Sequence, residues 1–277
     1  MYALARTVAA VAGIGWAWTA DELEGLVTAA GWIYRAPSEG TVSCTFDAAP
    51  GRAGAFLFGA EVTAVFLNLH EWDDDLHERD DLRVPVRRDG FVAAIAEVGA
   101  QLGPPVMRCP GPDPSVGWRV AAGVLEIVDR PGVLDLWLRP APRRVPHPPV
   151  QPVEEAVDWA TLEAGLAAAA ASLPAGARVR LAASTRKDAD SEPRPRGDAG
   201  EGTRALVELS QTEDGLTVRV GDGTETIRWP ATGETYRKIA EGLVTALRAG
   251  VANPAALVCR ADLPVPYLPL RREIRRT

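Results

Sequence analysis

The sequence has few of the side chains on which metal sites and disulfide frameworks depend. Its 277 residues include three histidines and three cysteines, and the cysteines are Cys44, Cys109 and Cys259. They are far apart in the sequence, and the chain has no C-x-x-C pair and no histidine cluster. An odd number of scattered cysteines favours a reducing compartment. We therefore expect the protein in the cytoplasm, with no bound metal and no cofactor.

Catalytic signature motifs are also absent. The chain has no G-x-S-x-G nucleophile motif and no phosphate-binding P-loop, and no serine or cysteine stands next to a histidine. Gly13-Ile-Gly15 lacks the third glycine of a dinucleotide-binding loop and is better explained as a helix break. We therefore expect a protein that is not an enzyme.

Long hydrophobic runs are absent as well. The apolar run from Thr7 to Trp18 is too short to cross a bilayer, and only Arg6 precedes it as a charged flank. A buried first helix fits this run better than a signal peptide, which is the alternative. A composition of 47% hydrophobic and 24% charged residues is typical of a soluble globular protein, and the length allows one large or two ordinary domains.

Proline is abundant in one stretch near the middle of the chain. Residues 139–152 read RPAPRRVPHPPVQP, and six of these fourteen residues are proline. Such a stretch favours an extended spacer and cannot continue a helix or a central strand. We therefore predict an N-terminal module over residues 1–139, a connector over 140–152 and a C-terminal module over 153–277.

The hydrophobic pattern has the same order of periods in both halves. In the first half, Thr19-Ala-Asp-Glu22 fits a capping box that starts a helix ended by Gly31. Short β-branched and aromatic runs follow, then a second helical run and closing strands. In the second half, the stripe of Trp159, Leu162 and Leu166 predicts a helix before a similar series. Residues 184–202 have no apolar side chain larger than alanine, and we expect a mobile loop there.

These patterns predict an α+β fold class with two similar modules. Each module is expected to be an antiparallel sheet covered by helices, in the order α-β-β-β-α-β-β. The expected strands of the first half are residues 41–46, 55–58, 61–69, 116–120, 124–128 and 133–138, and those of the second half are residues 179–183, 203–211, 216–220 and 224–229.

An acidic stretch over residues 70–81 is the most unusual local feature. It holds seven carboxylates, one arginine and the isolated Trp72. It fits a solvated loop, or a surface whose charges and tryptophan dock a basic partner. A metal site on His70, His77 and a carboxylate is a third explanation, although the two histidines are seven residues apart with no third close ligand. The partner-binding candidates are Trp72, Asp73, Asp74, Asp75, Glu78, Asp80 and Asp81.

Negative charge is concentrated in the N-terminal half. Residues 1–138 hold 19 acidic and 10 basic residues, a net charge of −9, whereas residues 154–277 hold 18 and 17. This excess argues against nucleic-acid binding and fits electrostatic steering of a basic partner. The other tryptophans, Trp16 and Trp18 among them, fall at element boundaries or on predicted inward faces, which predicts core packing.

The N-terminal half resembles an uncharacterised family of actinobacterial proteins. The resemblance rests on Gly15-Trp-Ala-Trp18, Ala30-Gly-Trp32, Gly117-Trp-Arg-Val120 and Leu134-Asp-Leu-Trp-Leu138. The C-terminal half resembles domains related to type III secretion chaperones and to the YbjN family, through Asp158-Trp159, Ser172-Leu-Pro-Ala-Gly176 and the helix around Tyr236. The resemblance to these chaperone-like domains implies the element order predicted here for both halves. Members of these families have been proposed as secretion chaperones or as immunity proteins encoded beside toxins.

Two hypotheses about function follow. The first is a non-enzymatic protein-binding protein, either an immunity protein that neutralises a toxin or a chaperone for a secreted effector. It implies a protein partner with a basic surface, and neither nucleic acid nor membrane. The alternative is an enzyme of unknown class with a site between the modules, using His70 or His77 and nearby aspartates.

Overall fold

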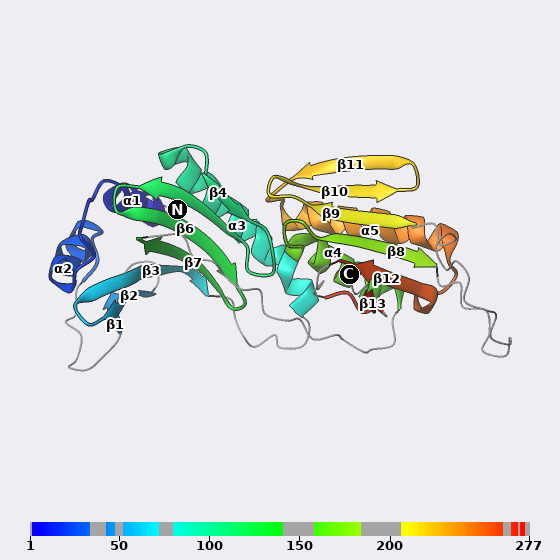
Figure 1. Cartoon of the computed structure of the whole chain (residues 1–277), viewed down its shortest axis with the longest axis horizontal. Coiled ribbons are helices and arrows are strands. Elements are labelled where there is room, and N and C mark those ends of the chain that lie inside the picture. The colour runs from blue at the N-terminus through cyan, green and yellow to red at the C-terminus, as the bar shows by residue number, and fades with distance from the viewer. Residues whose placement is uncertain are drawn as a thin grey trace. The chain divides into compact units, whose positions relative to one another are not determined.

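The chain forms two compact units (Figure 1). The computed structural model describes residues 2–33, 43–47, 52–71, 80–140, 158–183, 206–262, 267–270 and 272–274. The first unit contains Met1–Glu78 and Arg87–His147, and the second contains Arg79–Val86 and Pro148–Thr277. Residues 141–152 of the expected connector and the expected loop at residues 184–202 lie outside the described residues.

The first unit is a seven-stranded antiparallel sheet with three helices. The strand order is β1-β2-β3-β7-β6-β5-β4. Two strand ladders are therefore joined side by side through β3 and β7, which lie far apart in the sequence. The helices are α1 (Tyr2–Ala12), α2 (Ala20–Ala29) and α3 (Asp80–Leu102), of which the residues up to Val86 belong to the second unit. The strands are β1 (Ser43–Asp47), β2 (Arg52–Phe58), β3 (Glu61–Glu71), β4 (Met107–Cys109), β5 (Ser115–Val120), β6 (Gly123–Arg130) and β7 (Val133–Arg139).

The start of α2 differs from the predicted capping box. Thr19 makes no side-chain cap hydrogen bond, and the Glu22 carboxylate instead accepts the backbone N–H of Ala17 at 2.6 Å. The backbone of Thr19 is held in a β-bridge with Glu61, which sets the chain direction in place of the cap. The expected end is confirmed, because Gly31 has φ +75° and its N–H bonds to the Thr28 carbonyl at 3.0 Å.

The second unit is a six-stranded sheet in the order β11-β10-β9-β8-β12-β13. Its neighbouring strands are antiparallel except for the parallel pair β12 and β13. The helices are α4 (Trp159–Ser172) and α5 (Gly233–Gly250), with a short 3-10 turn at Pro254–Ala256. The strands are β8 (Arg178–Ala183), β9 (Val207–Gln211), β10 (Gly215–Val220), β11 (Gly223–Arg228), β12 (Leu257–Ala261) and β13 (Arg272–Ile274).

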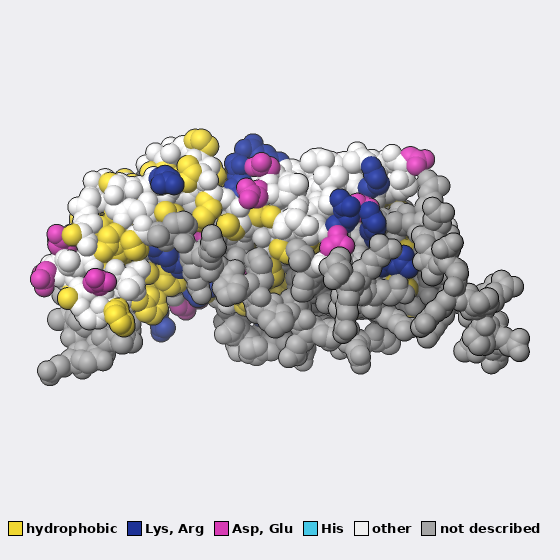
Figure 2. Space-filling model, in the orientation of Figure 1, with side chains coloured by type: hydrophobic (Ala, Val, Ile, Leu, Met, Phe, Trp, Pro, Cys, Tyr) yellow, Lys and Arg dark blue, Asp and Glu magenta, His cyan; other side chains and the backbone are white. Residues whose placement is uncertain are grey.

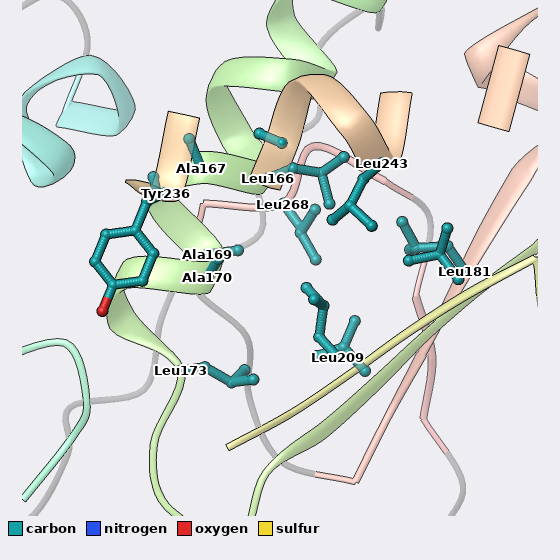
Figure 3. Packing of buried hydrophobic residues seen from close by; sticks show 14 of the residues in the cluster. Leu166, Ala167, Ala169, Ala170, Leu173, Leu181, Leu209, Tyr236, Leu243 and Leu268 are labelled. Atoms are coloured by element: carbon teal, nitrogen blue, oxygen red, sulfur yellow. The ribbon is translucent and has the colours of Figure 1, made fainter. Parts of the chain in front are cut away.

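Small side chains on α4 shape the core of the second unit (Figure 3). The five consecutive alanines at residues 167–171 are all buried, so α4 is enclosed on nearly every side. Leu166 of α4 and Leu243 of α5 belong to one buried cluster with Leu181 of β8 and Leu209 of β9. Val84 of α3 is part of the same cluster. Backbone and side chain therefore approach each other closely around α4, which leaves little room for added volume.

The predicted α+β class is confirmed, because both units are sheets packed with helices, and every described strand pair is antiparallel except β12 with β13. The two sheets differ in which earlier strand pairs with the strands that follow α3 in the first unit and α5 in the second. In the first unit β7 joins beside β3, whereas in the second unit β12 joins beside β8. The hydrophobic period identifies a strand but not its partner, so this difference has no signal in the local pattern.

Gly165 of α4 is a testable point in this packing. A Cβ at this position would lie 2.6 Å from the Tyr267 carbonyl oxygen and 2.7 Å from a side-chain carbon of Pro269. We expect Gly165→Ala to lower the free energy of unfolding by about 1–3 kcal/mol, as overpacking does. Urea denaturation followed by circular dichroism measures the change.

The matched control is Gly242→Ala in α5, where a Cβ would meet no atom within 4 Å. An exposed helical glycine replaced by alanine should raise the free energy of unfolding by about 0.5–1 kcal/mol. Equal effects of the two substitutions would contradict the close packing of α4.

Candidate functional site

Alternate residues of the first sheet form two chemically different faces. One set contacts the helices: Thr7 and Val11 of α1 line a small cavity together with Val65, Leu67 and Leu136 of the strands. The other set includes two phenylalanines and a group of charged residues. We define the aromatic–arginine cluster as Phe56, Phe66, Glu126, Arg130, Asp135, Trp137 and Arg139.

The register of three strands stacks the aromatic rings of this cluster. Phe66 of β3 pairs with Trp137 of β7, and the β2 residue Phe56 lies beside both. The ring centroids of Phe56 and Trp137 are 5.9 Å apart with an interplanar angle of 6°, and those of Phe66 and Trp137 are 5.3 Å apart. Trp137 is buried, whereas Phe56 is 42% exposed. A partly exposed ring therefore rests on a rigid aromatic base.

Two arginines flank the Trp137 ring. The guanidinium carbon of Arg139 lies 4.3 Å from the ring centroid, and that of Arg130 lies 5.4 Å from it. Arg139 donates to the Glu126 carboxylate at 2.7 Å, and Arg130 donates to the Asp135 carboxylate at 2.9 Å. Each arginine is thus held by one carboxylate and one aromatic face. The Arg130 side chain is 37% exposed, whereas the Arg139 side chain is 9% exposed.

Burial makes the two carboxylates electrostatically unusual. Asp135 Oδ1 and Glu126 Oε1 are buried, and neither has a hydrogen-bond partner among the residues that the structure describes. Burial raises the pKa of Asp135 above its ordinary value of 3.8, and the hydrogen bonds and charges of Arg130, Trp137 and Arg139 counteract only part of that rise. Ionising the buried Asp135 carboxylate therefore carries a desolvation penalty that its arginine partners offset only in part.

A second buried ion pair lies on the face that contacts the helices. Arg88 of α3 donates to the Asp129 carboxylate of β6, and both side chains are fully buried. The Asp129 backbone N–H also bonds to the Pro114 carbonyl at 3.0 Å. This pair ties α3 to the sheet, and its burial leaves it no contact with solvent. We assign it a structural role.

Trp16 and Trp18 do not pack in the core as expected. Both are half-buried, their ring centroids are 4.6 Å apart, and they line a cleft of about 980 Å³ beside the β5–β6 hairpin. The Trp18 indole N–H donates to the Ala122 carbonyl at 2.7 Å. The segment that carries them connects α1 and α2 and is held against the start of β3, which turns the rings outward from the helix-covered core.

Most of the partner-binding candidates in the acidic stretch lie outside the residues that the structure describes. Trp72, Asp73, Asp74, Asp75, Glu78 and His77 all lie outside the described residues, and Asp80 and Asp81 begin α3. His70 is exposed at the end of β3, beyond the aromatic–arginine cluster. Among the described residues, no group of three or more His, Cys, Asp or Glu side chains is placed to hold a metal ion.

Part of the aromatic–arginine cluster can be recognised in the sequence, although no catalytic or metal-binding motif marks it. In Leu134-Asp-Leu-Trp-Leu138, three leucines alternate with Asp135 and Trp137. Period two places the leucines on one face and the polar and aromatic residues on the other. A carboxylate beside a tryptophan indicates that this second face is not purely apolar, and in the structure Trp137 forms a small buried cluster there with Ala64 and Val128. Phe56 and Phe66 show no comparable pattern, because the residues beside them are set by the pairing of strands that are distant in the sequence.

The surface of the first unit mixes apolar and charged groups (Figure 2). Hydrophobic side chains lie beside arginines and carboxylates in this view. Phe58, at the end of β2, is 80% exposed. No helix in the described part of the chain is long and apolar enough to span a bilayer.

Comparison with known families gives a match over the N-terminal half of the chain. Residues 2–139 match the model of DUF6301, a family of unknown function. No curated protein and no solved structure matches the chain. The match agrees with the predicted resemblance of the N-terminal half to an uncharacterised family, and its range ends at the last residue of β7. The resemblance of the C-terminal half to secretion chaperones stays a prediction.

The raised pKa of Asp135 leads to a prediction about pH. A folded-state pKa above the unfolded value means that the neutral acid is the form favoured by folding, so this group contributes most stability below about pH 3.8. That contribution is lost as pH rises through the folded pKa. We expect the free energy of unfolding of Asp135→Asn, relative to that of the wild type, to increase as pH rises above 3.8.

Urea denaturation of both proteins across this pH range measures the difference. Effects of the substitution that do not depend on pH cancel when the slopes are compared, whereas the loss of the Arg130 ion pair is already part of the net pKa shift. A difference that stays flat, or that falls with rising pH, would contradict the assigned direction.

Proposed function

We propose that the protein is a non-enzymatic binding protein that masks a surface of a partner protein. The partner is either a toxin, for which the chain would be the immunity protein, or a secreted effector, for which it would be the chaperone. The observation that carries the proposal is the partly exposed Phe56 stacked on Trp137 between two restrained arginines.

The aromatic–arginine cluster has the composition of an interface hot spot. Tryptophan, tyrosine and arginine dominate measured hot spots, and they act where a partner excludes water from them. Phe56 offers apolar area for such burial, and Arg130 offers hydrogen-bond donors at its edge. Because Trp137 and Asp135 already hold Arg130 in place, binding would cost little additional side-chain entropy.

Net charge supports a partner with a basic surface. Residues 1–138 carry a net charge of −9, and the cluster balances its two arginines with two buried carboxylates. The excess negative charge therefore comes from residues outside the cluster, foremost the seven carboxylates of residues 71–81. In this proposal the acidic stretch steers the partner, and the aromatic cluster retains it.

The first test uses truncation of the exposed aromatic and of its neighbouring arginine. A partner captured by the wild-type protein from its native cells is identified and purified, and its binding to Phe56→Ala and Arg130→Gln is measured by surface plasmon resonance. We expect each substitution to weaken binding about tenfold, or about 1.4 kcal/mol.

Ile33→Ala and Arg52→Gln are the matched controls. Ile33 is 63% exposed, Arg52 is exposed, and neither belongs to the cluster. Both should bind like the wild type. Unchanged binding by both cluster variants would remove the cluster from the interface. Coexpression then separates the roles: an immunity protein prevents growth arrest by the partner, whereas a chaperone increases its soluble yield.

The acidic stretch gives a kinetic test of the same proposal. Exposed charges act through a field screened over about 10 Å at 0.1 M salt, so they mainly raise the association rate. Replacing Asp73, Asp74 and Asp75 with Asn should slow association and flatten its dependence on salt. Trp72→Ala should instead raise the dissociation rate, by about tenfold. If neither change alters the kinetics with a known partner, the acidic stretch is a solvated segment without a binding role.

A further inference from the structure

The cleft beside the β5–β6 hairpin is a second candidate binding site in the first unit. Its walls include the rings of Trp16 and Trp18 and the apolar side chains Val106, Met107 and Val124. The hairpin turn at residues 121–123 and Pro140 also line it. The aromatic–arginine cluster does not contribute to this lining.

The described side chains of the cleft offer hydrogen-bond donors without acceptors. The Trp16 indole N–H is buried, and it has no hydrogen-bond partner among the residues that the structure describes. Arg119 is exposed on β5 and lines the same cleft. A buried N–H without an acceptor is costly, so a ligand that supplies an oxygen there gains affinity. The occupant is therefore apolar, rich in acceptors and negatively charged near Arg119.

The Trp pair is held in place before any ligand arrives. Trp18 has φ +63°, a left-handed conformation that is unusual for a side chain of this size. Its carbonyl accepts the Val62 N–H at 2.7 Å, and its indole N–H bonds to Ala122. These contacts offset the unfavourable backbone conformation. They present two tilted indole rings to the cleft.

The openness of the cleft favours a polypeptide over a small molecule. Small-molecule sites bury most of the ligand surface, whereas Val106 in this wall is 64% exposed. A proline-rich segment in the polyproline conformation fits the polar groups best. Its backbone carbonyls have no internal partners, and proline has no N–H that would need an acceptor. Aromatic-lined grooves are the established mode of binding such segments.

We propose that the Trp16–Trp18 cleft binds an extended, proline-rich segment of a partner protein that carries a carboxylate for Arg119. The chain's own proline-rich stretch, residues 139–152, contains arginines and no carboxylate, so its charge does not match. This site stands independently of the function proposed for the aromatic–arginine cluster.

Fluorescence anisotropy with a labelled peptide of four Pro-Pro-Glu repeats tests the proposal. The full-length protein should bind this peptide saturably. Replacing every proline with alanine, or every glutamate with lysine, should weaken binding at least about tenfold. No saturable binding of the Pro-Pro-Glu peptide, or equal binding of the alanine peptide, would overturn the proposal.

Two substitutions in the cleft locate the binding. Trp16→Phe keeps a ring and removes the N–H, and Arg119→Gln removes the charge. Each should weaken peptide binding about tenfold, whereas Trp32→Phe and Arg52→Gln, which lie outside the cleft, should not. Trp16→Phe should not lower the melting temperature, because the N–H that it removes has no partner among the described residues. Unchanged affinity in both cleft variants would refute the assignment.

Other occupants give distinct results. If 4-phenylbutyrate displaces the peptide at lower concentration than the unlabelled peptide does, the cleft is a small-molecule site and the proposal is wrong. If the unliganded protein dimerises in sedimentation experiments and Trp16→Phe abolishes the dimer, a second copy occupies the cleft, which also overturns it. Phe56→Ala should leave peptide binding unchanged, so failure of one site does not imply failure of the other.

Discussion

The antiparallel pairing of β6 with β7 positions central residues of the aromatic–arginine cluster and part of the lining of the Trp16–Trp18 cleft. Its register sets Glu126 opposite Trp137 and Val124 opposite Arg139. The ends of the two strands meet closely at Gly123, where a Cβ would lie 2.1 Å from the Arg139 carbonyl oxygen. Gly123 also has φ +141°, a conformation open to glycine and unfavourable for other residues. One glycine thus permits the approach that brings Arg139 to the cluster, and the same glycine lines the cleft.

The buried charged residues of the first unit have different roles on the two faces of its sheet. Arg88 and Asp129 are both fully buried, so their pair specifies how α3 sits on the sheet and contributes nothing to a surface. Arg130 and Arg139 are instead held beside Trp137, and Arg130 reaches solvent. The carboxylates of Asp135 and Glu126 are desolvated to keep them there. A desolvated carboxylate lowers stability, and here it holds a solvent-facing arginine in one orientation, as the proposed binding role requires.

The second unit has a simpler energetic basis. Its core relies on close approach of α4 to its neighbours, which alanines and Gly165 make possible. Its charged residues are mostly exposed, as in the pairs of Arg178 and Arg180 with Glu208. Such pairs contribute little to stability. The features that indicate binding therefore lie in the first unit, within the range that matches the family of unknown function.

The sequence by itself determined the α+β class, most of the strands and the ends of several helices, because these depend on the local period of apolar residues and on glycine. It also determined the charge imbalance between the two halves of the chain. Only the tertiary structure decided that Phe56, Phe66 and Trp137 stack, because strands far apart in sequence supply them. It likewise decided that Trp16 and Trp18 line a cleft instead of the core. Strand order and register are non-local, and no local pattern of side chains encodes them.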